Sequence, residues 1–76
     1  MQPHEERVVQ EAKELDEKII NLTKFVHGAN DGWVGTLSAR FMGLDKAEQS
    51  RMMTQLHIMR AYSTILHARI NAFPTD

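Results

Sequence analysis

The sequence predicts an all-α fold: one antiparallel helical hairpin with a long loop that contains glycines and the single Trp, assembling as a homo-oligomer. Small and apolar residues recur in alternating steps of four and three in two segments, and most glycines lie between these segments. That spacing places each set along one stripe of an α-helix. The first stripe is Val8, Ala12, Leu15, Ile19, Leu22 and Val26, and the second is Met52, Leu56, Met59, Ser63, Leu66, Ile70 and Phe73.

Chain length supports the prediction of a homo-oligomer. The 76 residues make a single domain, 1–76, with no room for a second core. A chain of this size buries only about 60% of its unfolded surface, and small domains usually need disulfides, a metal or a partner chain. Because the chain has no Cys, a second copy is the means of stabilisation that we expect.

The first helix is predicted over residues 3–27. Pro3 suits the first turn of a helix, and Glu5 and Glu6 stabilise the positive end of the helix dipole. Gly28 follows directly after this helix and can adopt the left-handed C′ conformation that often ends a helix.

Residues 28–44 are predicted to form a loop. Asn30, Asp31 and Gly32 are residues that form turns. The stretch 36–42 has room for one or two helical turns, which Gly43 would end. Loops of this length usually carry a short helix or a function.

The second helix is predicted over residues 45–73, with Asp45 as its N-cap, Glu48 three residues later and Pro74 beyond its end. This helix is apolar over a wider arc than one hairpin partner can cover. A second patch beside its stripe is therefore predicted to be the oligomer interface. The patch consists of Met53, Ile58, Tyr62 and Ile65. The alternative is that Trp33 and Phe41 pack against this face within one chain.

Composition excludes several classes of protein. The net charge of −1 leaves too little positive charge to bind duplex nucleic acid. No apolar run reaches the roughly 18–20 residues of a membrane span, and the first residues lack the character of a signal peptide. The absence of Cys gives no indication of an oxidising compartment. We therefore expect a cytoplasmic protein with no membrane and no duplex nucleic acid as partners.

The sequence lacks the residue patterns of a catalytic centre. The four His residues never stand three or four positions apart, which is the spacing of a helical pair of metal ligands. The Ser residues lack a nucleophile elbow, and no Lys-Ser or Lys-Thr follows the glycine-containing loop, as a phosphate-binding loop requires. We expect no enzymatic activity, no metal site and no cofactor.

The loop and its borders hold the residues best suited to bind a small ligand. Aromatic rings can stack on a base, an amide can read a base or ribose edge, and cations can meet phosphates. The candidate ligand-binding residues are Asn30, Trp33, Arg40, Lys46, Arg51 and Tyr62. A neighbouring subunit would have to complete such a site. The alternative is that Trp33 only closes the open end of the hairpin.

The chain also resembles a family of small proteins from tailed phages and prophages that are related to a crAss-like phage protein. The first segment carries the resemblance from Arg7 to Val26, as Arg7-Val8-Val9-x-Glu11-x-x-Glu14-Leu15-Asp16-x-Lys18-Ile19-x-x-Leu22-x-x-Phe25-Val26. The second carries it at Phe41, Leu44, Glu48, Gln55, Met59, Tyr62, Ser63, Ile65, Leu66, Arg69 and Ile70. Residues 28–39 depart from the family as an insertion, so no function of the loop can be carried over.

This resemblance implies a phage accessory protein that acts in the cytoplasm of an infected bacterium. Its architecture is similar to that of the helical hairpins with which phages sequester nucleotide signals of the CBASS and Thoeris immune systems. We therefore expect the oligomer to hold a cyclic dinucleotide or an ADP-ribose derivative without cleaving it. The alternative is a non-enzymatic inhibitor or adaptor, such as an anti-CRISPR-type protein, that binds a host defence protein. That alternative expects an exposed apolar patch centred on Trp33, Phe41 and Met42.

Overall fold

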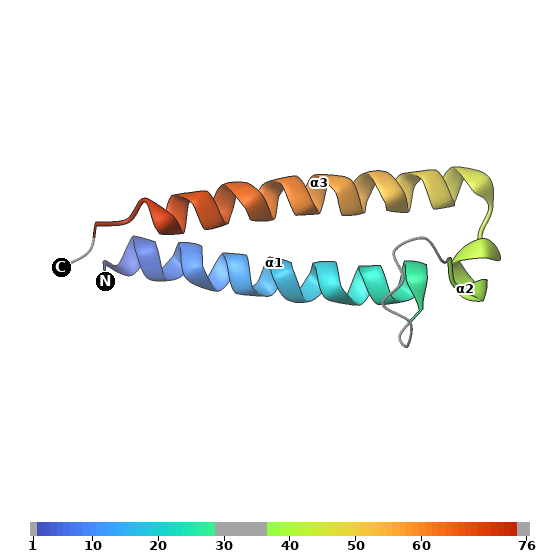
Figure 1. Cartoon of the computed structure of the whole chain (residues 1–76), viewed down its shortest axis with the longest axis horizontal. Coiled ribbons are helices and arrows are strands. Elements are labelled where there is room, and N and C mark those ends of the chain that lie inside the picture. Colours follow the sequence, from blue (N-terminus) through green and yellow to red (C-terminus); the bar gives the residue numbers. More distant parts are fainter. Residues whose placement is uncertain (1, 29–36, 75–76) are drawn as a thin grey trace.

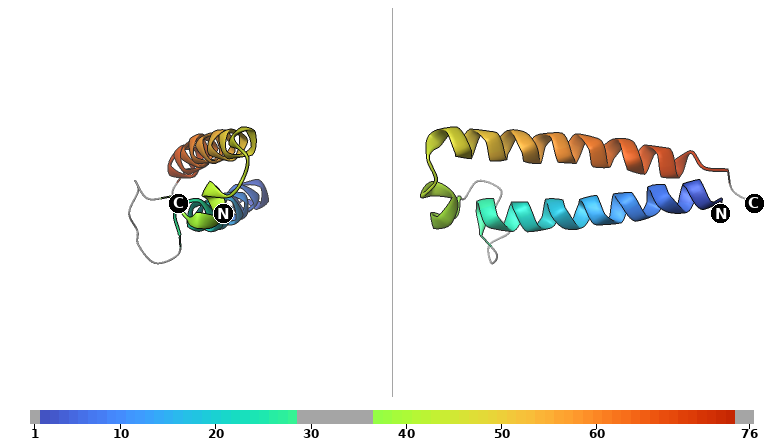
Figure 2. Two further views of the ribbon diagram at one scale, coloured as in Figure 1. Left: turned by 90° about the vertical axis from the view of Figure 1, so that its right-hand side faces the viewer. Right: turned by 180° about the vertical axis from the view of Figure 1, so that it is seen from behind.

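The computed structural model describes residues 2–28 and 37–74, and in these ranges it forms an antiparallel helical hairpin. Helix α1 (Pro3–His27) and helix α3 (Lys46–Asn71) lie side by side along their length, and the short helix α2 (Ala39–Met42) lies at the end where the chain turns back. The views in Figures 1 and 2 agree that the first turn of α1 and the last turn of α3 share the opposite end. The predicted all-α hairpin is confirmed; its assembly as a homo-oligomer stays a prediction.

Helix α1 has the predicted bounds, and its two ends are held by backbone contacts. The backbone N–H of Gln2 donates a hydrogen bond to the Glu5 carboxylate over 2.8 Å. This contact keeps the carboxylate at the positive end of the helix, although Glu5 is only 7% exposed. At the other end Gly28 has φ +91° and donates its N–H to the Lys24 carbonyl oxygen over 2.8 Å. The φ is positive as predicted, but the ψ of 156° places Gly28 in an extended conformation that glycine alone adopts readily, and not in the predicted left-handed helical one.

Ser38 attaches α2 to the end of α1. Its backbone N–H donates to the Val26 carbonyl oxygen over 2.7 Å, and its hydroxyl donates to the Phe25 carbonyl oxygen. The same hydroxyl accepts the N–H of Phe41 over 3.1 Å and so caps α2. The predicted short helix is thus present, over residues 39–42 of the stretch 36–42.

Helix α3 begins as predicted and ends slightly earlier. The Asp45 carboxylate accepts the N–H of Glu48 over 2.7 Å, which confirms Asp45 as the N-cap. The helix ends at Asn71, whereas the prediction placed its end at Phe73. The Phe73 N–H bonds the Ile70 carbonyl oxygen in a tighter turn, because a residue that precedes proline is disfavoured in the helical conformation.

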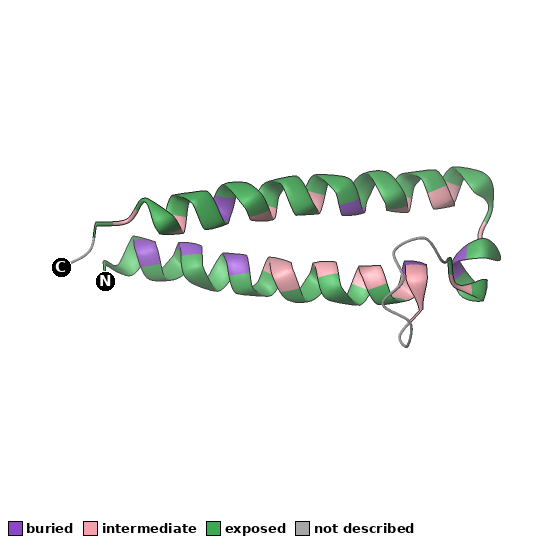
Figure 3. Cartoon of the chain, in the orientation of Figure 1, coloured by how far each residue is buried: buried purple, intermediate pink, exposed green. Residues whose placement is uncertain are grey.

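The two predicted stripes face each other and form the core. One buried cluster contains Val8, Ala12 and Leu66, against which Leu15, Ile70 and Phe73 pack. Toward the loop end Val26, Phe41 and Leu56 are almost fully buried. Figure 3 shows these buried positions on the facing sides of the helices, with half-buried residues between them.

The expectation of an exposed patch centred on Trp33, Phe41 and Met42 is wrong for Phe41. Its side chain is 2% exposed because α2 packs against α1 and turns the ring inward. Met42 is exposed, and Trp33 lies outside the described residues. A four-residue helix is too short for periodicity to show which of its side chains face the core.

Candidate functional site

The apolar contact between α1 and α3 is interrupted near its middle by polar side chains. Ser63 is the one polar member of the α3 stripe, and its hydroxyl donates to Asp16 Oδ1 over 2.6 Å. The second carboxylate oxygen, Oδ2, accepts a hydrogen bond from His67 Nε2 over 2.8 Å. A small serine in place of a large apolar residue leaves space beside the carboxylate.

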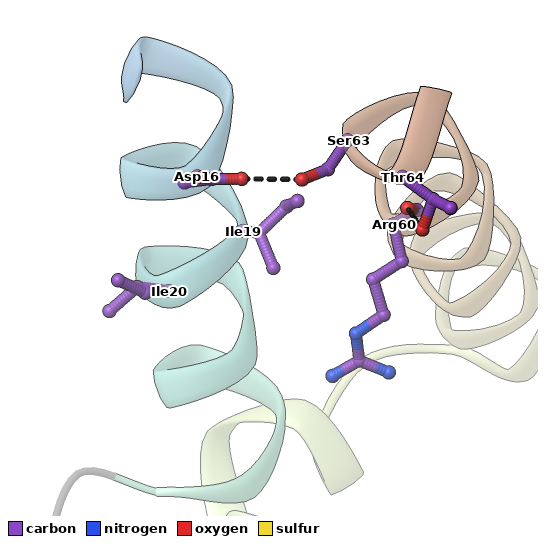
Figure 4. A pocket seen from close by; sticks show the side chains of 6 residues that line it. All are labelled: Asp16, Ile19, Ile20, Arg60, Ser63 and Thr64. Carbon is purple, nitrogen blue, oxygen red and sulfur yellow. Dashed lines mark hydrogen bonds between the residues drawn. The ribbon is translucent and has the colours of Figure 1, made fainter. Parts of the chain in front are cut away.

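That space is an open hollow of about 490 Å³ on one side of the hairpin. Figure 4 shows its side chains: Asp16 and Ser63 face each other, and Arg60 extends from α3 toward α1. Its lining consists of Asp16, Ile19, Ile20, Arg60, Ser63 and Thr64.

A second hollow of about 440 Å³ continues along the same side of the hairpin. It shares Asp16 and Ile20 with the first, so the two form one surface depression, which we call the side groove. The second hollow is lined by Val9, Ala12, Lys13, Asp16, Glu17, Ile20, His67 and Ile70. The side groove thus combines an apolar floor with carboxylates, hydroxyls and cations.

Asp16 is the fixed negative charge of the side groove. The hydrogen bond from Ser63, followed by the one from His67 and by its charge, lowers the pKa of the Asp16 carboxyl below the ordinary value of 3.8. The carboxyl is therefore ionised at neutral pH and acts only as an acceptor of hydrogen bonds.

Arg60 supplies positive charge nearby. Its Nη2 donates to Thr23 Oγ1 at 3.4 Å, which is long for a hydrogen bond. The guanidinium is exposed and retains further donors that can meet a planar anionic group.

Tyr62, a predicted ligand-binding residue, does not line the side groove. Its hydroxyl donates to the Glu11 carboxylate of α1, and this bond is the main reason that the pKa of the Tyr62 phenol is raised above its ordinary value. The contact ties Tyr62 to α1 and leaves the ring partly exposed.

Three other predicted site residues, Arg40, Lys46 and Arg51, lie at the loop end. The Arg40 guanidinium lies 5.7 Å from the centre of the Phe25 ring, and Lys46 opens α3. Arg51 Nε donates to Glu48 Oε1 over 2.8 Å. Tyr62 lies eleven residues beyond Arg51, about 16 Å along the helix.

One copy of the chain therefore does not bring Tyr62 to the loop-end cations. Asn30 and Trp33 lie outside the described residues, so the predicted set stays a prediction.

Sequence reasoning missed the side groove. Asp16, Arg60 and Thr64 were not predicted to bind a ligand. The relative register of the two helices decides which of their residues lie opposite each other, and the periodicity of each helix does not give that register. One signal was available: Ser63 is polar within an otherwise apolar stripe.

The described residues also limit the chemistry of the site. Within residues 2–28 and 37–74 no three His, Asp or Glu side chains are grouped so as to hold a metal ion. No helix in these ranges is both long and apolar enough to span a membrane. The groove offers hydrogen-bond donors and acceptors that are suited to holding a polar ligand.

A family model described as Sequestin matches residues 2–72, which is nearly the whole chain. No curated protein and no solved structure matches it.

Proposed function

Because the chain belongs to the Sequestin family, we propose that it binds a small anionic nucleotide and holds it without cleaving it. The name of the family is consistent with a sequestering role. The ligand that we propose is a nucleotide signal of bacterial immunity, either a cyclic dinucleotide or an ADP-ribose derivative. In this proposal the chain is a phage accessory protein that acts in the cytoplasm of the infected cell.

The side groove carries this proposal. Arg60, Asp16 and Ile20 offer three different chemistries along one depression. A guanidinium suits a phosphate, an ionised carboxylate accepts the hydroxyls of a ribose, and an isoleucine that is 52% exposed offers an apolar surface to a base. Ser63 and Thr64 add hydroxyl oxygens that can accept hydrogen bonds, since their own hydrogens are donated to Asp16 and to the Arg60 carbonyl oxygen.

The sequence also predicts that cations at the loop end contact the phosphates of this ligand; these are Arg40, Lys46 and Arg51. They can do so only if the ligand, or a neighbouring copy, spans the distance between the loop end and the side groove. Arg51 lies nine residues before Arg60, about 13 Å along α3.

Isothermal titration calorimetry with a panel of cyclic dinucleotides and cyclic ADP-ribose isomers tests the proposal. We expect at least one ligand to bind with a Kd below about 10 µM, roughly −7 kcal/mol. Mass spectrometry of the material released by heating should recover that ligand intact. If no member of the panel binds, the proposal is wrong and inhibition through protein contact becomes the better reading. If the ligand is recovered as cleavage products, the proposal is also wrong, because the protein is then an enzyme.

Matched variants locate the site. Arg60→Gln should weaken binding at least tenfold, because it removes a charged contact with phosphate worth about 1.5–3 kcal/mol. Arg7→Gln makes the same change on α1 away from the groove and should leave Kd unchanged. If the double variant Arg40→Ala with Arg51→Ala weakens ligand binding and Arg60→Gln does not, the ligand binds at the loop end.

A further inference from the structure

Helix α3 carries a second periodic stripe on the side that faces away from α1. We call it the outer seam; its members follow each other in steps of four and three and are Ala47, Arg51, Thr54, Ile58, Ala61, Ile65, Ala68 and Ala72. Ile58 and Ile65 are 59% and 57% exposed, and Figure 3 shows the outer edge of α3 exposed along its length. One hairpin therefore leaves in contact with water a regular stripe that is apolar from Ile58 onward.

The distribution of charge indicates that the outer seam is covered. Residues 52–68 contain a single Asp, Glu, Lys or Arg, which is Arg60, and its guanidinium turns toward Thr23 of α1. The exposed side of α1, by contrast, carries Lys13, Glu14 and Lys18 within six residues. A solvated helix face is normally charged, so α1 shows the pattern of a free face and α3 does not.

We propose that the outer seam binds the outer seam of a second copy of this chain, with the two α3 helices antiparallel. The spacing of the seam requires a helical partner that repeats every seven residues, and a second copy offers such a seam on a helix of equal length. The inference does not depend on the nucleotide function, because it rests on a different face of the protein.

The alternation of large and small residues favours the antiparallel arrangement. Ile58 and Ile65 occupy one heptad position, while Thr54, Ala61 and Ala68 occupy the other. In antiparallel helices the two positions face each other, so each Ile packs against a small residue of the other copy. In parallel helices each heptad position faces the same position of the other copy. Ile would then pack against Ile, gaps would remain between facing Ala residues, and Arg51 would lie against Arg51 of the partner subunit.

Charge then selects the register. With Ile65 against the partner's Ala61, Ile58 meets the partner's Ala68, and Arg51 lies beyond the last turn of the partner's α3. The carbonyl end of a helix favours a cation there. A shift by one heptad would instead place Arg51 beside the partner's Arg69, where the two positive charges repel.

The outer seam refines the predicted interface. At about 100° per residue, Met53 lies roughly 140° around the helix from Ile58, whereas Tyr62 lies only about 40° from it. We therefore assign Ile58 and Ile65 to the centre of the contact and Tyr62 to its edge, and we leave Met53 outside it.

Light scattering coupled to gel filtration tests the association. At about 50 µM we expect a mass twice the 8.7 kDa of the chain. Ile65→Lys should give the monomer mass with an unchanged far-ultraviolet circular dichroism spectrum, because the side chain is exposed within one hairpin. Asn21→Lys, a matched change on the exposed face of α1, should keep the dimer. A wild-type monomer, or a dimer that survives Ile65→Lys, would overturn the proposal.

Disulfide cross-linking tests orientation and register, since the chain has no Cys of its own. Under mild oxidation, Ala61→Cys mixed with Ile65→Cys should form a mixed disulfide dimer. Ala61→Cys alone should cross-link slowly, because the two copies of residue 61 lie four residues apart in this register, beyond the roughly 7 Å that a disulfide can bridge. Rapid cross-linking of Ala61→Cys alone would show a parallel pair and overturn the antiparallel arrangement.

Discussion

Ser63 of α3 and Asp16 of α1 share a hydrogen bond of 2.6 Å across the middle of the hairpin, 47 residues apart in the chain. The bond occupies the one position where the α3 stripe is polar, and it lies between the two buried apolar regions. It therefore joins the two helices at this register and, at the same time, holds an ionised carboxylate in the side groove.

The lowered pKa of Asp16 makes the stability of the hairpin depend on pH. Because the folded pKa lies below the ordinary 3.8, the carboxylate stabilises the fold above pH 3.8, and this contribution is lost as the pH falls through the folded pKa. Asp16→Asn should therefore destabilise the protein at neutral pH and differ little from wild type near pH 2.

Urea unfolding followed by circular dichroism from about pH 2 to pH 7 measures this difference. Glu17→Gln, on the rim of the same groove, is the control and should show no such convergence. A free-energy gap between wild type and Asp16→Asn that stays constant over this range would contradict the linkage.

The two hydrogen bonds to Asp16 should contribute unequally to its pKa. The hydrogen bond from Ser63 is the largest single contribution and the one from His67 comes next, with the charge of His67 adding a smaller one, so Ser63→Ala and His67→Ala should each raise the pKa of the carboxyl. Carboxyl carbon shifts in a nuclear magnetic resonance titration report the pKa directly. An unchanged pKa in either variant would show that the residue replaced does not bind Asp16 in solution.

Features that depend on neighbouring residues could be predicted from sequence. The bounds of α1, the cap at Asp45 and the positive φ of Gly28 all follow from the residues next to them. The burial of both stripes followed from periodicity alone. Glu5 was expected only to interact with the helix dipole; the structure adds its burial and its bond to the Gln2 N–H.

The candidate site depended on the register between the helices. Asp16, Arg60 and Thr64 are unremarkable polar residues in the sequence, and only the antiparallel pairing brings them to one groove. The prediction favoured the loop because its residue types are rarer. It placed Tyr62 with the loop cations, whereas in the structure the Tyr62 hydroxyl is bound to Glu11 on α1.

Gly28 and Gly43 should respond oppositely to substitution by Ala. At Gly28 the combination of φ +91° and ψ 156° strains any other residue although nothing lies within 4 Å of an added Cβ, so Gly28→Ala should cost about 1–3 kcal/mol of stability. At Gly43 the φ of −76° suits Ala, and the nearest atom is 3.4 Å away. Gly43→Ala should therefore be neutral or stabilise by up to about 1 kcal/mol. Equal effects of the two changes in chemical denaturation would show that φ does not decide the outcome.

Leu66 and Ile65 are adjacent in α3 but should differ in what they stabilise. Leu66 is fully buried against Val8 and Ala12, so Leu66→Ala should cost about 2–5 kcal/mol at every protein concentration. Ile65 faces away from α1, so Ile65→Ala should change the stability of the dilute monomer by less than about 0.5 kcal/mol. At high concentration Ile65→Ala should be less stable than wild type, because folding is then linked to the proposed dimer.

Urea denaturation at two protein concentrations a hundredfold apart separates these effects. If Ile65→Ala lost as much stability as Leu66→Ala in dilute solution, the outer seam would be part of the hairpin core and could not serve as a free surface.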